Sequence, residues 1–414
     1  MNIIDLFSGA GGLSEGFRNV GFKNIAHVEV DKHASKTLKL REAFYYLKEQ
    51  NKLNIYEKYL KDELKFEEML SLIPSSVTNK VINKEINQEN INDILSDINE
   101  LKGDKTIHGI IGGPPCQAYS TIGRARNKDK LKTDERVYLF NFYIDFLKEF
   151  EPEFFIFENV KGLLSFKDYN GDLLLPLIKK SFQDALHVGS YEIEYKIVNS
   201  ADYGVSQNRE RLIIFGKKKN VIAKSFFKSL IKYKNTPLTL NELFFDLPQL
   251  KSGESNNCYR KSEPNSFIKN YYRKYNLPLS QNISRPNNDN DLKIYQIVAE
   301  GKKRGENVKY SDLPSNLIKH KNNHGFLDRF KALDGSGIAH TVVAHIAKDG
   351  HYYIHQDALQ NRSITVREAA RLQTFPDDYY FESSRTSAFR QIGNAVPPLL
   401  AEKFASVIQN DLYL

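Results

Sequence analysis

Residues 2–31 decide the fold, and they read NIIDLFSGAGGLSEGFRNVGFKNIAHVEVD. The segment begins with a short apolar run over residues 2–7, and a glycine-rich turn follows it. Apolar residues then recur at the spacing of one helix face, at Leu13, Phe17 and Val20. A second apolar run covers residues 25–30. A strand, a turn, a helix and a second strand in this order predict a parallel, doubly wound α/β sheet.

The glycine-rich turn predicts a nucleotide-like ligand. Small residues between a strand and a helix let backbone N–H groups approach such a ligand closely. Glu29 lies 20 residues after Gly9, at the end of the second strand, where a carboxylate can bind both ribose hydroxyls. A dinucleotide and S-adenosylmethionine both fit this geometry, and a tight turn without a ligand is a further interpretation. Ser14 stands where the dinucleotide pattern has its third glycine, which weakens the dinucleotide hypothesis.

The rest of the chain extends this pattern and adds a second module. Further strands are expected over residues 81–86, 107–111, 154–157, 193–198 and 211–215, and helices over 91–101, 139–150, 366–373 and 398–412. We therefore expect a catalytic and cofactor-binding domain over 1–216, a smaller irregular module over 217–361, a connecting segment over 362–390 and a return to the first domain over 391–414.

Charge is distributed unevenly between these parts. The 414 residues carry a net charge of +8. Residues 217–361 hold 24 Lys and Arg against 13 Asp and Glu, a net charge of +11, so the rest of the chain carries about −3. A basic module beside a slightly acidic one predicts contact with a polyanion such as nucleic acid. A solvated, lysine-rich surface would produce the same composition.

The most specific motif is Gly112-Gly113-Pro114-Pro115-Cys116-Gln117, which follows a buried strand. Open α/β sheets bind their ligands at the carboxyl ends of such strands. A lone cysteine is usually a small buried hydrophobic residue. The polar, proline- and glycine-rich setting of Cys116 instead favours a reactive thiol, whose pKa would have to be lowered by a nearby positive charge or a helix N-terminus.

An acid and two arginines are expected near this cysteine. Glu158 ends another strand, and a carboxyl group there with a pKa raised by burial could protonate a ring nitrogen. Arg209 and Arg211 lie two residues apart on one face of an extended segment, a pair suited to phosphate or a ring carbonyl. An ordinary strand-end glutamate and a solvent-exposed salt bridge with Glu210 are the alternatives.

Composition excludes several other classes of protein. No apolar run approaches the ~20 residues of a membrane span, and the N-terminus lacks the pattern of a signal peptide. Two cysteines, Cys116 and Cys258, are too few for a disulfide framework or a thiolate zinc site, which indicates a reducing compartment. We expect a cytoplasmic protein without a metal site.

Taken together, these segments resemble the cytosine-C5 DNA methyltransferase family of bacterial restriction-modification systems. The resemblance rests on motifs in the family's order: DLFSGAGGLSEGF (5–17), VEVD (28–31), GGPPCQAYS (112–120), FENV (157–160), QNRERL (207–212), RSITVREAARLQTFPDDY (362–379) and QIGNAVPP (391–398). It implies an S-adenosylmethionine-dependent methyltransferase fold, a doubly wound mixed sheet, with 217–361 as the target-recognition domain.

The resemblance also implies a catalytic role for each matched residue. Cys116 would attack C6 of a cytosine flipped out of a specific duplex sequence, and Glu158 would protonate or hydrogen-bond N3. Arg209, with Arg211 beside it, would hold the base carbonyl. C5 would then take the methyl group from S-adenosylmethionine, and loss of the C5 proton and of the thiolate would restore the ring. Extrusion of a base costs a few kcal/mol, which pocket contacts must offset.

The cofactor and DNA sites follow from the same motifs. The cofactor would contact Phe7, Ser8, Gly9, Ala10, Gly11, Gly12, Leu13, Glu29, Val30, Glu85, Ile86, Pro114, Asn394, Ala395 and Val396. The family's Asp-Ile pair at the third strand is matched by Glu85-Ile86, which we prefer, or by Asp93-Ile94. DNA would contact Gln117, Ser120, Arg124, Arg136, Gln207 and Thr341. The role of the insertion at 32–80 is not implied.

Three other functions are compatible with parts of the sequence. A tRNA cytosine-C5 methyltransferase would use the same chemistry, although the large basic module favours duplex DNA. A dehydrogenase would explain the glycine-rich turn but not the Pro-Pro-Cys motif, and an inactive DNA-binding protein would not explain why Cys116, Glu158 and Arg209 occur together. As partners we expect double-stranded DNA and a restriction endonuclease that acts on the same site without forming a stable complex, and we expect a monomer associated with the nucleoid.

Overall fold

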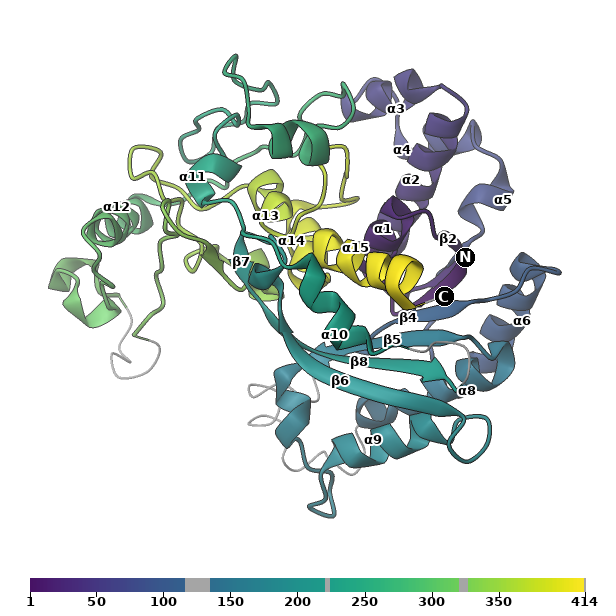
Figure 1. The fold of residues 1–414 in the computed structure, drawn as a ribbon. Coiled ribbons are helices and arrows are strands. Elements are labelled where there is room, and N and C mark those ends of the chain that lie inside the picture. The colour runs from purple at the N-terminus through teal and green to yellow at the C-terminus, as the bar shows by residue number, and fades with distance from the viewer. Residues whose placement is uncertain (116–134, 220–223, 320–326, 413–414) are drawn as a thin grey trace.

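The computed structural model describes residues 1–115, 135–219, 224–319 and 327–412 (Figure 1). Seven strands form one sheet in the order β3-β2-β1-β4-β5-β8-β6. The strands are β1 (Asn2–Leu6), β2 (Lys23–Val28), β3 (Val81–Ile82), β4 (Gly109–Gly112), β5 (Phe154–Val160), β6 (Tyr191–Asn199) and β8 (Glu210–Lys218). β8 runs antiparallel to β5 and β6, and the other pairs are parallel. The predicted mixed, doubly wound sheet is confirmed.

Helices cover both faces of this sheet. The helices α1 (Gly12–Asn19), α10 (Phe226–Leu230) and α15 (Pro398–Val407) pack on the face that carries Ile3 and Phe154. The helices α6 (Ile91–Lys102), α8 (Phe140–Phe150) and α9 (Leu174–Gln183) pack on the face that carries Ile4 and Phe155. Because successive strand residues point to opposite faces, each apolar strand supplies both cores. The central strands β4 and β5 are therefore nearly continuous apolar runs, whereas β6 includes charged residues and is partly exposed.

The insertion after β2 is a helical cluster. It comprises α2 (Lys32–Glu49), α3 (Leu53–Leu60), α4 (Phe66–Ser71) and α5 (Ser75–Thr78). Its own core includes Phe44, Tyr56 and Met69, all fully buried, and Tyr275 and Tyr380 pack against that core from distant parts of the chain. The insertion therefore joins the sheet domain to later segments (Figure 1).

Loops dominate the described part of the irregular module, which carries helices and one strand of a two-stranded sheet. The helices α11 (Leu240–Leu243) and α12 (Asp289–Lys303) are separated by loops, and β9 (Ala339–His340) pairs in parallel with β7 (Gln207–Asn208). The apolar residues Ile294, Tyr295 and Val298 give α12 a buried face. The first residues of the expected module do not pack with the rest of it, because α10 lies in the core of the sheet domain. The boundary at residue 217 stays a prediction.

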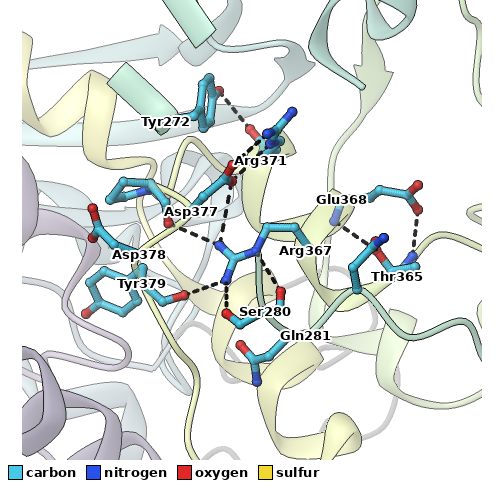
Figure 2. A network of polar contacts seen from close by, with 12 residues as sticks. Tyr272, Ser280, Gln281, Thr365, Arg367, Glu368, Arg371, Asp377, Asp378 and Tyr379 are labelled. Carbon is cyan, nitrogen blue, oxygen red and sulfur yellow. Dashed lines mark hydrogen bonds and ion pairs between the residues drawn. The ribbon is translucent and has the colours of Figure 1, made fainter. Parts of the chain in front are cut away.

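A buried polar network fastens the module to the segment that follows it (Figure 2). In α13 (Val366–Leu372), the Arg367 and Arg371 side chains are fully buried. Arg371 donates to Asp246 at 2.6 Å and to Asp377 at 2.6 Å. Arg367 donates to the backbone oxygens of Ser280 and Tyr379 at 3.1 and 2.9 Å. Segments 87 and 125 residues apart in the sequence are thus held together by charge-assisted hydrogen bonds.

We expect Arg371→Met to lower the free energy of unfolding by about 3 kcal/mol, because it removes the nearest cation from two buried carboxylates. Asp246 then keeps Arg273 as its cation at 3.1 Å, and Asp377 keeps Arg367 at 3.8 Å. Chemical denaturation followed by circular dichroism measures this change. Arg304→Met is the matched control, since Arg304 forms an exposed pair with Glu306, and exposed pairs contribute about 0–1 kcal/mol. Equal stabilities of the two variants would contradict the assignment.

Candidate active site

The candidate site lies where three neighbouring strands end. Leu6 of β1 pairs with Gly112 of β4, and Gly112 pairs with Phe157 of β5. The glycine-rich loop, the Pro114-Pro115 segment and Glu158 therefore leave the sheet at the same edge, where open α/β sheets bind ligands. The Asn159 side-chain amide donates to the Pro114 backbone oxygen at 3.4 Å, which draws the proline segment toward β5.

Several predicted site residues lie outside the described residues. These are Cys116, Gln117, Ser120 and Arg124, and the side chain of Arg136 is also outside. The last described residue before them is Pro115, which is exposed at the crevice edge of β4. Pro115 therefore lies at the same edge of the sheet as Glu158.

The glycine-rich loop and Glu29 form one unit. The Gly9 N–H and the Asp31 N–H each donate to the Glu29 carboxylate at 2.7 Å. Burial raises the pKa of this carboxyl group above its usual value. A Cβ atom built on Gly9 would meet nothing within 4 Å, so the space beside the loop is open there. Val30, the next residue along, is 57% exposed.

The return of the chain completes the wall of this crevice. A Cβ atom at Gly12 would lie 2.1 Å from the Val396 backbone oxygen, so only glycine allows this close approach. Ala395 and Val396 are buried, and Asn394, the last residue of α14 (Arg385–Asn394), is exposed. Residues near both ends of the chain thus lie side by side.

The third strand is shorter than expected because it pairs with β2 over only two residues. The chain leaves the sheet after Ile82. Glu85 is exposed beyond that strand end and Ile86 is buried, while Asp93 lies in the first turn of α6 and is also exposed. The position past a strand end favours Glu85 over Asp93, and the choice stays a prediction.

Glu158 has an arginine partner in the structure. The Arg211 Nε atom lies 3.0 Å from Glu158 Oε1, and the two side chains are 14% and 15% exposed. Glu158 and Arg211 come from the antiparallel strands β5 and β8. The Glu158 carboxyl group and the Arg211 guanidinium group therefore lie side by side at the crevice edge, where both are partly accessible to a ligand.

Arg209 lies elsewhere, in the interior. Its fully buried guanidinium group donates to the backbone oxygens of Val342 at 2.8 Å and Gly393 at 3.2 Å. Arg209 therefore links Val342 of the irregular module to Gly393 of α14. The structure therefore favours Arg211 over Arg209 for contact with a base carbonyl.

Gln207, expected to contact DNA, is also buried. Its amide nitrogen donates to the Leu372 oxygen at 2.8 Å and to Gln373 at 2.7 Å, and its oxygen accepts from the Val342 N–H at 2.8 Å. An amide whose two ends are bound within the protein is not available to DNA. We therefore correct this prediction: Gln207 is a bridge between segments.

Thr341 lines an open cleft of about 430 Å³ beside Glu158 and Arg211. Its hydroxyl group donates to the Asn208 backbone oxygen. The cleft is also lined by Val160, Lys161, Gly162, Asn199, Asn208, Glu210 and Arg211. Sequence reasoning did not single out Lys161, Asn199 or Asn208. For Lys161 the sequence offers one signal, which is that it directly follows the motif Phe157-Glu158-Asn159-Val160.

The described residues contain neither a membrane span nor a metal cluster. No helix within them is both long and apolar enough to cross a membrane. In the same part of the chain, no group of three His, Cys, Asp or Glu side chains could hold a metal ion.

The seven-stranded mixed sheet, with helices on both faces, has the methyltransferase fold that the sequence predicts. The sequence matches the model of the C-5 cytosine-specific DNA methylase family over residues 1–71 and 76–410, and the chain belongs to that family. It is therefore an enzyme that methylates C5 of cytosine in DNA. The family assignment supports a DNA methyltransferase over a tRNA methyltransferase, a dehydrogenase or an inactive DNA-binding protein.

Individual relatives agree with this family. The type II methyltransferase M.Bpa9945I of Bacillus paralicheniformis is 39% identical over 443 residues, covering 99% of each chain. The type II methyltransferase M.DdeI of Desulfomicrobium norvegicum is 29% identical over 425 residues, covering 99% of this chain and 88% of the relative. A prophage-encoded E. coli protein described as a DNA modification methyltransferase shares the fold, with a TM-score of 0.64, 24% identity and 99% coverage of each chain.

Proposed function

We propose that the protein methylates one cytosine within a specific duplex DNA sequence, with S-adenosylmethionine as the methyl donor. The observation that carries the proposal is the convergence of the glycine-rich loop, Glu158 and the chain leading to Cys116 on one sheet edge. The donor set fits the cofactor, since the loop offers N–H groups and open space while Glu29 offers a buried carboxylate for ribose hydroxyls. Val30, Glu85, Ile86 and Pro114 would flank the adenine, and residues 394–396 would close the site.

The chemistry starts with a covalent bond to the base. The Cys116 thiolate attacks C6 of the extruded cytosine, and the electron pair of the C5–C6 double bond becomes available at C5. Glu158 gives a proton or a hydrogen bond to N3, and Arg211 donates to the neighbouring carbonyl oxygen, so both stabilise the charge that develops on the ring. Arg211 replaces Arg209 in this role because it is accessible and lies beside Glu158.

When bound, S-adenosylmethionine supplies an electrophilic methyl group for C5. A base then removes the C5 proton, and the C6–S bond breaks so that Cys116 leaves as a thiolate while the double bond re-forms. Any proton that N3 received returns to Glu158. Flipping of the base is required because C5 and C6 are not accessible to this chemistry inside the stack. Thr341 and Lys161 line the cleft and would contact the DNA backbone around the flipped nucleotide.

The relatives support a biological context. The relatives from Bacillus paralicheniformis and Desulfomicrobium norvegicum are both named type II methyltransferases. We propose that this enzyme acts as a monomer in the cytoplasm, at the nucleoid. There it would protect a sequence that a separate restriction endonuclease cleaves.

Bisulfite sequencing of DNA from cells that express the protein tests the proposed function. We expect protected cytosines at one position of one short sequence, and none in cells that express Cys116→Ala. Methylation confined to tRNA, or protected cytosines without a common sequence, would contradict the proposal.

We expect the irregular module to determine which DNA sequence the enzyme methylates. Exchange of residues 235–361 for those of a relative with another target should transfer the specificity, since this segment is basic and carries none of the cofactor motifs. The exchange begins at 235 because residues 226–230 pack on the sheet. A chimera that is folded, is active and retains the original target sequence would refute the assignment.

A further inference from the structure

The glycine-rich loop has a backbone conformation that needs support. Phe7, Gly9 and Gly11 have φ angles of 53°, 54° and 73°, in the left-handed region. For Phe7 this conformation is strained, and such residues persist only where their surroundings hold them. The side chains that hold this loop therefore affect any ligand that binds its N–H groups.

Two side chains hold the loop from opposite sides. Glu29 accepts from the Gly9 N–H on the ligand side. On the interior side, the Tyr379 hydroxyl donates to the Ala10 backbone oxygen at 2.5 Å. Tyr379 is only 1% exposed, and burial raises its pKa well above the usual value, so its hydroxyl keeps its proton and remains a donor.

These two contacts differ in what happens when a cofactor binds. In the proposed site the Glu29 carboxylate also has to accept hydrogen bonds from the ribose hydroxyls, in addition to the Gly9 N–H. The Tyr379 hydroxyl is buried on the far side of the loop and has no such second duty. Tyr379 therefore remains the side-chain contact that fixes Ala10 in the loaded enzyme.

Arg41 of the inserted helix α2 holds Tyr379 in place. Its Nε atom donates to Glu15 of α1 at 2.9 Å, and its Nη1 atom donates to Asp378 at 2.6 Å. The guanidinium carbon lies 4.7 Å from the centre of the Tyr379 ring. Arg41 thus joins the helix that begins at the loop to the segment that carries Tyr379.

The rest of the insertion supports the same segment. The buried Tyr56 hydroxyl donates to the Asp378 backbone oxygen at 2.8 Å, and the Thr37 hydroxyl accepts from the Glu382 N–H at 2.8 Å. Leu38 packs directly against the loop, since a Cβ atom built on Gly11 would lie 2.7 Å from the Leu38 Cδ2 atom. The insertion contacts both the loop and residues 378–382.

We propose that Tyr379 and Arg41 are positioning residues for the cofactor, and that the inserted helix α2 is the outer brace of the cofactor loop. They preorganise the loop N–H groups, so that binding does not have to order a strained backbone. The inference rests on the proposed S-adenosylmethionine site. It assigns to residues 32–80 a function in cofactor affinity.

Tyr379→Phe tests this inference, because it removes one hydroxyl group and keeps the ring. We expect the Kd for S-adenosylhomocysteine, measured by calorimetry on the full-length protein, to rise about five- to tenfold. The KM for S-adenosylmethionine should rise by a similar factor, with kcat at saturating cofactor changed less than about twofold. Arg41→Met is expected to raise the same Kd at least as much.

Tyr272→Phe is the matched control. Tyr272 is equally buried, and its hydroxyl donates to the Arg371 backbone oxygen at 3.0 Å, away from the loop. Both tyrosine variants should lower the thermal unfolding midpoint to a similar extent, but only Tyr379→Phe should weaken binding. An unchanged Kd in Tyr379→Phe, or equal weakening in Tyr272→Phe, would overturn the inference. A wild-type protein that binds no S-adenosylhomocysteine would instead overturn the proposed cofactor on which it rests.

Discussion

Replacement of Cys116 by alanine is expected to lower kcat for methyl transfer by about four orders of magnitude or more, as is typical when an enzyme loses its nucleophile. Without the thiolate no bond forms at C6, and C5 of cytosine is then too weak a nucleophile to take a methyl group. Binding of duplex DNA and of S-adenosylhomocysteine should persist, because neither depends on the covalent step. Transfer of labelled methyl groups to duplex DNA measures the rate.

Cys258→Ala is the matched control for this experiment. Cys258 is exposed in the irregular module and is the other cysteine of the chain. Its replacement should leave kcat unchanged. A Cys116→Ala enzyme with wild-type activity would contradict the nucleophile assignment, and a loss of activity in Cys258→Ala would show that thiol chemistry lies elsewhere.

The second large effect is expected at the Glu158–Arg211 pair. Glu158→Gln should lower kcat by about 10²–10⁴-fold, because the amide cannot protonate N3 as the carboxyl group does. Arg211→Met should lower kcat to a similar extent, because it removes a donor from the developing charge. Since the two side chains touch at 3.0 Å, the double variant should lose less than the product of the single losses.

Two controls make this result specific. Glu192→Gln removes a carboxylate that pairs with Lys217 at the opposite end of β8, and it should leave kcat unchanged. Arg209→Met should act mainly through stability, because its guanidinium group binds backbone oxygens in the interior. If Arg209→Met lowered kcat in a fully folded enzyme while Arg211→Met did not, the original assignment of the carbonyl contact to Arg209 would be restored.

The sheet and the crevice were predictable because their signals are local. Most strands that the sequence predicts are short apolar runs buried on both faces, and parallel topology brings the ends of β1, β4 and β5 together. The exception is β6, which includes charged residues and is partly exposed. Glycine at position 12 likewise marks a close approach of backbone, here to Val396. The site could therefore be assembled from the order of the motifs.

The two arginines were harder to place because the strand is interrupted between them. Alternation along a strand would put Arg209 and Arg211 on one face. In the structure β7 ends at Asn208 and pairs with β9, while β8 begins at Glu210 and pairs with β5. Arg209 occupies the break and turns inward, so the rule of alternation does not apply across it.

Long-range polar contacts were also beyond sequence reasoning. Arg41 and Asp378 are 337 positions apart, and no local pattern connects them. The helix α12 was missed because its apolar residues Ile294 and Val298 stand among charged and amide side chains. Both features depend on tertiary packing, which overrides local propensity.

The central claim is that Cys116 forms a covalent bond to a cytosine during methyl transfer. Duplex DNA that carries 5-fluorocytosine at the target position, incubated with the enzyme and S-adenosylmethionine, tests it most directly, because fluorine at C5 cannot leave as the proton does. We predict a stable protein–DNA adduct whose peptide, by mass spectrometry, is modified at Cys116. Turnover of the unmodified duplex without any adduct on the fluorinated one, or an adduct at another residue, would contradict the account.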